Sequence, residues 1–177
     1  MLEIPSQFVS IIKESAIMRR VPGMLLAALL YHESDFDPNA RSENPDGSVD
    51  RGIAQINNKA WPDVSDAQAY DPKFAIPWCA QRLQTLHEVE GCRNWYEVCL
   101  AYNGGMGAVY AYREGKGYNQ AYADRIFTTS RIQDIANEYQ RAITALGNCW
   151  FMDALNRDFY HLTANQLRNM MGWRLES

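Results

Sequence analysis

The sequence lacks any hydrophobic stretch long enough to cross a membrane. Its longest apolar run covers residues 24–31, whereas a spanning helix needs about 20 apolar residues. The N-terminal residues 1–6 also lack the basic region followed by an apolar stretch that marks a secretion signal. We therefore expect no transmembrane segment and no signal peptide in this sequence.

The sequence also lacks an excess of positive charge. Its formal net charge is −4 at pH 7, whereas a general nucleic-acid binder needs a basic patch to neutralise phosphates. We therefore expect no nucleic-acid partner.

Residues with metal-ligand spacing are absent as well. The four cysteines, Cys79, Cys92, Cys99 and Cys149, contain no C-x-x-C pair, and the three histidines lie far apart. A bridge between Cys92 and Cys99 stays open, although free buried thiols are favoured for a protein made in the cytosol. The sequence predicts neither a metal site nor another cofactor.

A calcium loop is the one metal alternative with a partial sequence match. Asp35, Asp37 and Asn39 alternate as the first ligands of such a loop do. However, Ala40 stands where the sharp turn requires glycine, and no glutamate follows at the closing position. We therefore do not favour calcium binding.

What the chain does contain is typical of a soluble globular protein. Of its 177 residues, 47% are hydrophobic and 21% are charged, and no repeat, low-complexity tract or linker interrupts them. We predict an all-α fold with at most a minor β element. Residues 1–147 are expected to form the main domain, and residues 148–177 a helical extension packed on it.

Helix signals occur along most of the chain. Ser6 is expected to cap the first helix, Pro22 to open a second that is apolar on nearly every side, and Asn94 with Glu97 to form a capping box. Residues 35–50 have loop composition. The helices after the first are expected at residues 22 to about 32, 72 to about 90, 94–102, 106 to about 115 and 118–146. Residues 103–105 are expected to break the helical pattern, and Gly147 to cap the end of the long helix. A last short helix is expected after Thr163.

Glu33 is the candidate catalytic residue. It follows the apolar residues 24–30 and precedes a polar loop. A carboxyl group against apolar packing loses solvation of its charged form, so its pKa is expected to rise, as a general acid working near neutral pH requires. Taken alone, Glu33 is better explained as an ordinary helix end.

Glu33 belongs to the first of several short motifs that follow one another along the chain. They are Leu26-Ala-Ala-Leu-Leu-Tyr-His-Glu33-Ser34, Phe36-Asp-Pro38-Asn-Ala40, Gly52-Ile-Ala-Gln55-Ile56, Ala101-Tyr102-Asn103-Gly104-Gly105 and, more weakly, Tyr122 with Arg125 and Ile126. Across residues 22–122 the sequence resembles the soluble lytic transglycosylase and goose-type lysozyme family. The resemblance implies a lysozyme-like helical domain with a catalytic cleft.

The resemblance also implies roles for individual residues. Glu33 takes the place of the catalytic acid, with Ser34, Gln55, Tyr102 and Asn103 as substrate-binding or supporting residues. Ala54 departs from the pattern, because family members often carry methionine there. That change alters packing in one sugar subsite and removes no chemistry.

The implied reaction is cleavage of the β-1,4 bond between N-acetylmuramic acid and N-acetylglucosamine in peptidoglycan. With one glutamate as acid and base and the substrate's acetamido group as its helper, the product is a 1,6-anhydro sugar. A goose-type lysozyme would instead use water, which Asp46 or Asp50 would have to position. Local turn contacts are the favoured role for those two aspartates. Asn57 replaces an aspartate common in goose-type lysozymes, and it cannot act as a base, which favours the transglycosylase.

Other functional classes stay open. A chitinase-like glycosidase would keep the enzyme and change the substrate, and a wall-binding or phage structural module would keep the fold without the chemistry. We favour a monomeric, bacteriolytic enzyme. Without a signal peptide, a cell-wall enzyme is expected to be a phage endolysin released through a holin, or a lysin carried by the virion.

Overall fold

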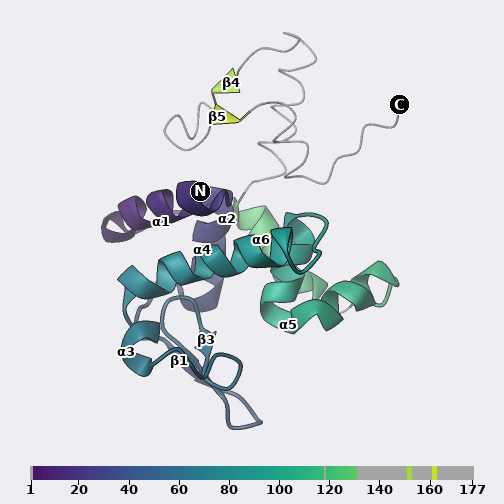
Figure 1. Ribbon diagram of the computed structural model, residues 1–177, viewed down its shortest axis with the longest axis horizontal. Coiled ribbons are helices and arrows are strands. Elements are labelled where there is room, and N and C mark those ends of the chain that lie inside the picture. Colours follow the sequence, from purple (N-terminus) through teal and green to yellow (C-terminus); the bar gives the residue numbers. More distant parts are fainter. Residues whose placement is uncertain (1, 118, 131–150, 153–160, 163–177) are drawn as a thin grey trace. The chain divides into compact units, whose positions relative to one another are not determined.

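The computed structural model describes residues 2–117, 119–130, 151–152 and 161–162. Helices dominate this part of the chain, and its strands are at most three residues long, so the predicted all-α class with a minor β element is confirmed. Figure 1 labels the elements. They are α1 (Ser6–Arg19), α2 (Gly23–Ser34), β1 (Arg41–Glu43), β2 (Val49–Arg51), β3 (Ile56–Asn57), α3 (Asp66–Ala69), α4 (Pro72–Glu88), α5 (Trp95–Arg113), α6 (Gln120–Ser130), β4 (Phe151–Met152) and β5 (His161–Leu162).

The chain divides into two compact units, Met1–Arg82 and Leu83–Ser177, with the division inside α4. The predicted main domain over residues 1–147 and extension over 148–177 stay predictions, because most residues after 130 lie outside the described part. The same holds for the helix expected up to residue 146, for the Gly147 cap and for the last helix after Thr163. In the extension, β4 and β5 form an antiparallel pair.

Helix α2 forms the centre of the first unit. All six residues from 25 to 30 have no exposed surface, which confirms that a helix apolar on every side lies in the interior. Pro22 is its N-cap rather than its first residue, and the helix continues through Glu33 and Ser34. No helix in the described ranges combines the length and apolar character needed to span a bilayer.

Helix α1 packs against α2. The helix starts one residue earlier than predicted. Ser6 is the first helical residue and Pro5 the N-cap, so the assignment of Ser6 as a cap was wrong. Pro5 holds the chain at φ −55°, and its carbonyl accepts from the Phe8 N–H at 2.9 Å. Phe8 and Ile12 are buried.

A small antiparallel sheet occupies part of the predicted loop. Strands β1, β2 and β3 pair in that order, with Ser42 opposite Asp50 and Asp50 opposite Asn57. The sheet and α3 lie together at the lower left of Figure 1. Strands of two or three residues are too short to produce an alternating hydrophobic pattern, so the sequence carries no strand signal here.

Helices α3 and α4 follow the sheet. Helix α4 begins at Pro72, as predicted, and ends at Glu88. Helix α3 was not predicted, although Ser65 and Gln68 form a complete capping box at its start. The three described cysteines, Cys79, Cys92 and Cys99, are buried, and none of them forms a disulfide.

Helix α5 in the second unit folds back on itself. Its backbone is non-helical at Gly105, with φ 65° and ψ −176°, which confirms the predicted break. Glu97 and Arg113 are 16 residues apart and would be separated by about 24 Å along a straight helix. Their side chains nevertheless meet at 2.6 Å. Gly105 therefore turns the second half of α5 back toward the first.

The Glu97–Arg113 ion pair holds this turn closed. The Glu97 side chain is 4% exposed and that of Arg113 is 20% exposed. Arg113 Nη2 also donates to the Gly91 carbonyl at 2.8 Å. Asn94 accepts from the Glu97 N–H, as the capping box predicts, but the Glu97 carboxylate accepts from the Arg93 N–H at 2.6 Å instead of returning to Asn94. The predicted box is therefore only half formed.

Burial alone would raise the pKa of Glu97. The hydrogen bonds from the Arg113 guanidinium and the Arg93 N–H, together with the positive charge of Arg113, outweigh burial and lower that pKa below its ordinary value. A carboxylate with a lowered pKa in the folded state stabilises the protein above its unfolded-state pKa. This stabilisation is lost as pH falls through the folded-state pKa.

Replacing Arg113 by methionine should therefore destabilise the protein in a pH-dependent way. At pH 7 we expect the free energy of unfolding to fall by about 2–3 kcal/mol, below the range for a fully buried pair because water reaches Arg113. At about pH 3 a larger fraction of the Glu97 carboxyl group carries a proton than at pH 7, so the loss should shrink. Urea denaturation at both pH values measures the difference. Arg93→Met is the matched control, and an Arg113→Met effect equal at both pH values would contradict the assignment.

Candidate active site

Glu33 lies where the buried core of α2 meets the following loop. It is the second-last residue of the helix and is partly exposed, whereas Leu29 and Leu30, one turn earlier, are fully buried. Asp35 and Phe36 then take left-handed conformations at φ 54° and 61°. They reverse the chain immediately after Ser34, so Glu33 stands where the buried part of α2 gives way to the more exposed loop.

Packing of Phe36 holds this reversal in place. A bulky aromatic residue is disfavoured in the left-handed region. The ring of Phe36 is buried and lies 6.5 Å from that of Phe8 and 6.0 Å from that of Tyr31, measured between centroids. Aromatic burial of this kind offsets the backbone strain.

Ser34 joins the end of α2 to the turn formed by residues 52–55. Its Oγ lies 2.9 Å from the Ile53 carbonyl oxygen and 3.2 Å from that of Leu30, and it donates to them. The single hydroxyl proton is shared by these two backbone acceptors. Ser34 therefore fixes the Glu33 end of α2 against the 52–55 turn, and its predicted contact with substrate stays a prediction.

The 52–55 turn presents Gln55. Gln55 has a left-handed backbone at φ 48°, and its Nε2 donates to the Gly52 carbonyl at 2.9 Å and to the Ala40 carbonyl at 3.4 Å. Both bonds use the amide nitrogen, so Oε1 is the group that can accept from a ligand. The partly exposed side chain of Gln55 is thus oriented before any substrate binds.

Gly52 is required by the close approach of α3 to this turn. It has φ +70°, and a Cβ atom there would lie 2.0 Å from the Ala69 carbonyl oxygen. No side chain fits at that distance. The turn and the end of α3 are therefore in direct backbone contact.

Asp50 is held by two amide side chains. One carboxylate oxygen accepts from Asn44 Nδ2 at 2.8 Å and the other from Asn57 Nδ2, also at 2.8 Å. The buried Ser48 hydroxyl accepts from both amides as well, at 3.1 and 2.9 Å. Asn57 Oδ1 accepts from the backbone N–H groups of residues 59 and 60. These four side chains form one hydrogen-bonded network across the sheet.

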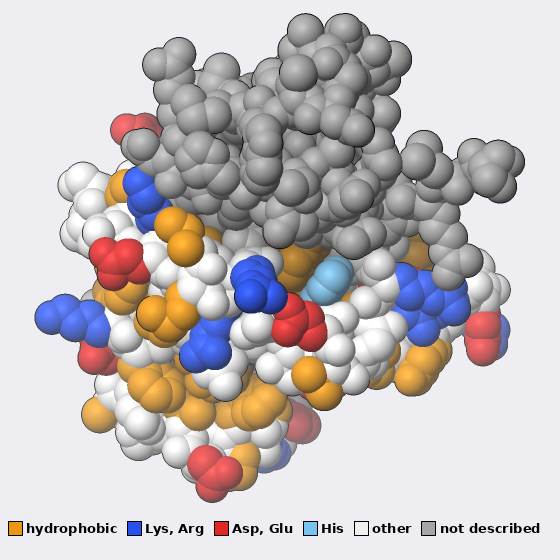
Figure 2. Space-filling model, turned by 45° about the horizontal axis from the view of Figure 1, so that its top comes forward, with side chains coloured by type: hydrophobic (Ala, Val, Ile, Leu, Met, Phe, Trp, Pro, Cys, Tyr) orange, Lys and Arg blue, Asp and Glu red, His pale blue; other side chains and the backbone are white. Residues whose placement is uncertain are grey.

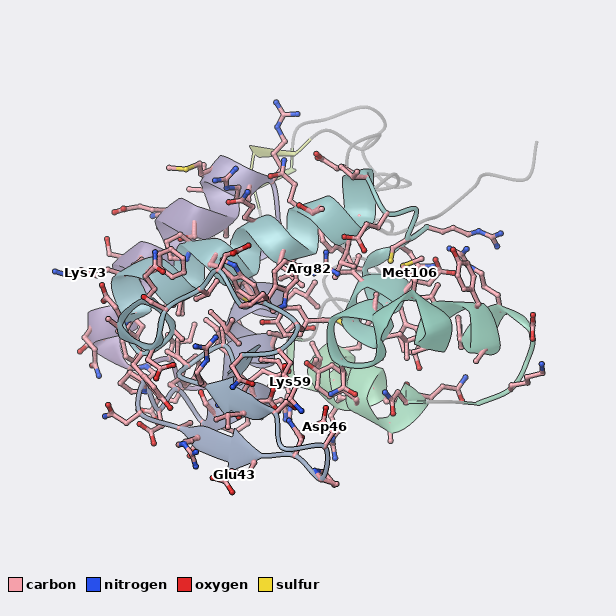
Figure 3. The ribbon with its side chains drawn as sticks, turned by 60° about the horizontal axis from the view of Figure 1, so that its bottom comes forward. Glu43, Asp46, Lys59, Lys73, Arg82 and Met106 are labelled. Carbon is pink, nitrogen blue, oxygen red and sulfur yellow. The ribbon has the colours of Figure 1, made fainter. Side chains whose placement is uncertain are left out.

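Asp46 lies at the tip of the β1–β2 hairpin. Its carboxylate accepts from the Ser48 N–H at 2.9 Å and lies 3.7 Å from Lys59 Nζ. Figure 3 labels both Asp46 and Lys59. The hydrogen bond from Ser48 and the charge of Lys59 lower the pKa of Asp46. Asp46 therefore has the local turn contact that its sequence context indicated, and positioning of water by Asp46 or Asp50 stays a prediction.

Charges of both signs are interspersed on the described surface. In Figure 2, Lys and Arg side chains lie among Asp and Glu side chains on the part of the face that is coloured. On the sheet, Arg41 pairs with Glu43 at 2.6 Å. Such local pairs largely cancel each other's field at longer range.

Arg51 is a supporting residue that the sequence did not indicate. Its Nε donates to the Ile56 carbonyl at 3.1 Å, and its Nη1 to the Val64 carbonyl at 3.0 Å and to Asp66 at 2.7 Å. The residue is only 5% exposed. Arg51 thus links β2, the strand before the 52–55 turn, to the start of α3. The one hint of this role in the sequence is that the residues following Arg51 in the chain become buried.

Tyr102 and Asn103 belong to the second unit. They lie in the last turn of α5 before the break at Gly105, with Tyr102 partly buried and Asn103 exposed. Asn103 Oδ1 accepts from Asn119 Nδ2 at 2.8 Å. Asn119, which precedes α6, was not identified from the sequence. The first unit therefore holds Glu33, Ser34, Asp46, Asp50 and Gln55, and the second holds Tyr102 and Asn103.

Comparison with known proteins relates this chain to a domain family and to a mouse protein. Residues 10–125 match the family model described as "Transglycosylase SLT domain". A mouse (Mus musculus) protein named "Lysozyme-like protein 6" is 33% identical in an alignment of 81 positions, which covers 39% of this chain and 53% of the mouse protein. The matched region thus spans about half the length of that relative.

Replacing Gly52 by alanine should strongly destabilise the first unit. The left-handed backbone and the overlap with Ala69 together are expected to cost at least about 3 kcal/mol. Gly47→Ala is the matched control, because Gly47 has φ +74° but its Cβ would meet only Lys59 Nζ, at 3.9 Å. That variant should lose only about 1 kcal/mol. Thermal or urea unfolding measures both, and equal losses would refute the role of the Ala69 contact.

Replacing Asn57 by aspartate should place two carboxylates side by side in the network. One of them must then take a proton or be repelled by the other, so the pKa of the pair rises. A raised pKa in the folded state means that the destabilisation grows as pH rises above the unfolded-state value.

We therefore expect the melting temperature of Asn57→Asp to fall further below that of the wild type at pH 7 than at about pH 4. Asn58→Asp is the control. The Asn58 side chain accepts from the Val49 N–H through Oδ1, which an aspartate keeps. A pH-independent difference for Asn57→Asp would show that the Asp50 contact is not the cause.

Proposed function

Because the chain belongs to the transglycosylase SLT domain family within the lysozyme-like superfamily, we propose that it is a lytic transglycosylase. The family acts on peptidoglycan through transglycosylase or glycosidase chemistry. In our proposal this chain cleaves the β-1,4 bond between N-acetylmuramic acid and N-acetylglucosamine. Glu33 is the single catalytic acid and base, and the product carries a 1,6-anhydro ring.

The observation that carries this proposal is the way the end of α2 is fixed. The hydrogen bond from Ser34 to the Ile53 carbonyl holds the residue next to Glu33 against the turn that presents Gln55. A general acid must be held at a defined position relative to the groups that bind the substrate. Gln55 Oε1 is an acceptor for a sugar hydroxyl or amide N–H in that arrangement.

In the proposed reaction Glu33 first gives its proton to the glycosidic oxygen, and the bond from that oxygen to the anomeric carbon breaks. The acetamido oxygen of the muramic acid then binds the anomeric carbon and forms a cyclic cationic intermediate. In the second step the Glu33 carboxylate takes the proton of the sugar's 6-hydroxyl. The 6-oxygen attacks the anomeric carbon and the acetamido oxygen leaves, so no second carboxylate is needed.

The surroundings of the other carboxylates favour this route over hydrolysis. Hydrolysis requires a group that positions a water molecule. Asp50 already accepts from two amides, and Asp46 binds Ser48 and Lys59. Asn57 has no basic form at neutral pH. We propose that none of these three residues, Asp46, Asp50 and Asn57, activates water.

Tyr102 and Asn103 are proposed to contact the substrate.

Hydrolysis is the competing proposal, because the mouse relative is named as lysozyme-like. Mass spectrometry of the products released from purified peptidoglycan separates the two outcomes. A transglycosylase releases fragments that end in anhydromuramic acid, each one water lighter than the reducing fragments of a lysozyme. Reducing ends as the main product would replace our proposal by hydrolysis.

Glu33→Gln should abolish release of these fragments while the protein stays folded. The amide cannot donate the proton, so we expect a fall in kcat of about 10³-fold. Glu43→Gln is the matched control, because Glu43 undergoes the same change at an exposed strand position and pairs only with Arg41 among the described residues. It should retain wild-type turnover.

Two outcomes would contradict the proposed role of Glu33. Fragment release by Glu33→Gln at the wild-type rate would exclude it as the catalytic acid. A folded wild-type protein that binds peptidoglycan and releases no fragment would support a wall-binding module instead. Circular dichroism of each variant establishes that the fold is retained.

A further inference from the structure

Asn119 and Asn103 form a side-chain pair between α5 and the start of α6. The two helices pack against each other within the second unit. Asn119 has a left-handed backbone at φ 59°, a conformation that asparagine tolerates better than most residues. Its Nδ2 donates to Asn103 Oδ1 at 2.8 Å.

We propose that Asn119 is a positioning residue that sets which end of the Asn103 amide faces a ligand. An asparagine side chain carries a donor at one end and an acceptor at the other. Because Asn119 donates through its nitrogen, it can bind only the oxygen of Asn103. The Asn103 Nδ2 group then points away from Asn119, and Asn103 is exposed.

The ligand chemistry follows from this orientation. An outward NH₂ group selects an acceptor, such as the acetamido carbonyl or a hydroxyl oxygen of an N-acetyl sugar. Without Asn119 the amide would sample both orientations, and about half of the molecules would present the wrong end. A ligand that binds one of two equally populated states loses about twofold in apparent affinity. This inference rests on the proposed function, in which Asn103 contacts the glycan.

Aspartate at position 119 gives the sharpest test. It has nearly the same size and also tolerates a positive φ, but its carboxylate can only accept. Asn103 would turn over and donate Nδ2 to the introduced carboxylate, leaving its own oxygen outward. The side-chain bond and the thermal stability are kept, whereas the donor toward the ligand is lost.

We expect kcat/KM for peptidoglycan cleavage to fall about tenfold in Asn119→Asp, since the ligand must compete with a charge-assisted hydrogen bond. Asn119→Gly frees the amide and should lose about twofold. In an Asn103→Ala background, all three residues at position 119 should give the same rate. Gln120→Glu adds a negative charge next to Asn119 and should leave the rate unchanged.

A binding titration makes failure of this inference distinguishable from failure of the proposed function. The probe is N-acetylchitotriose, followed through the Asn103 side-chain NH₂ signals by ¹⁵N NMR. The signals should shift in the wild type, and the affinity should decrease in the order wild type, Asn119→Gly, Asn119→Asp.

If that order holds and no glycan fragment is released, the cleavage proposal fails and the role of Asn119 stands. If the wild type cleaves and Asn119→Asp matches it in rate and affinity, the role of Asn119 is refuted. Equal effects of Asn119→Asp with and without Asn103 would also refute it, because they would indicate a structural role alone.

Discussion

The hydrogen bond from Ser34 to the Ile53 carbonyl is the contact on which the first unit's candidate site depends. It joins two segments of opposite character, helix α2, whose residues 25–30 are fully buried, and a turn of four residues. The buried part of α2 has no room to shift because its side chains are enclosed on all sides. The turn has no room either, because Gly52 touches the backbone of α3 and Arg51 is bound to three acceptors. The side chains of Glu33 and Gln55 thus extend from two rigid supports.

The second unit reaches a similar rigidity by different means. Gly105 supplies a conformation that other residues adopt at a cost, and the Glu97–Arg113 ion pair keeps the two halves of α5 together. Tyr102 and Asn103 stand directly before the break, where the helix would otherwise continue. A short side chain on a fixed helix end is easier to orient than one on a free loop, and Asn119 completes that orientation from the start of α6.

Local signals in the sequence predicted much of this fold. The apolar run of α2, the Asp71-Pro72 start of α4 and the glycine pair in α5 act over a few residues, so each is readable without the tertiary structure. The same local patterns placed Glu33 at the end of a buried helix. The ordered motifs of the family then singled out Gln55, Tyr102 and Asn103. Their roles in binding depend on a ligand and remain predictions.

What the sequence did not reveal is the set of contacts between distant residues. Glu97 was expected to complete a local capping box, but an arginine 16 residues away offers two charge-assisted hydrogen bonds, which are stronger than one neutral bond. Arg51 and Asn119 likewise act on partners in other elements and leave no local pattern. The short strands were missed because pairing partners, not composition, define them.

The aromatic contact between Phe8 and Phe36 extends the functional region beyond its sequence boundary. The family match starts at residue 10, yet Phe8 packs on the residue that sustains the strained reversal after Ser34. The first turns of α1 therefore stabilise a loop that lies almost thirty positions later in the sequence. A fragment cut to the limits of the family match would keep every polar group of the motifs and lose the ring that holds their backbone in shape.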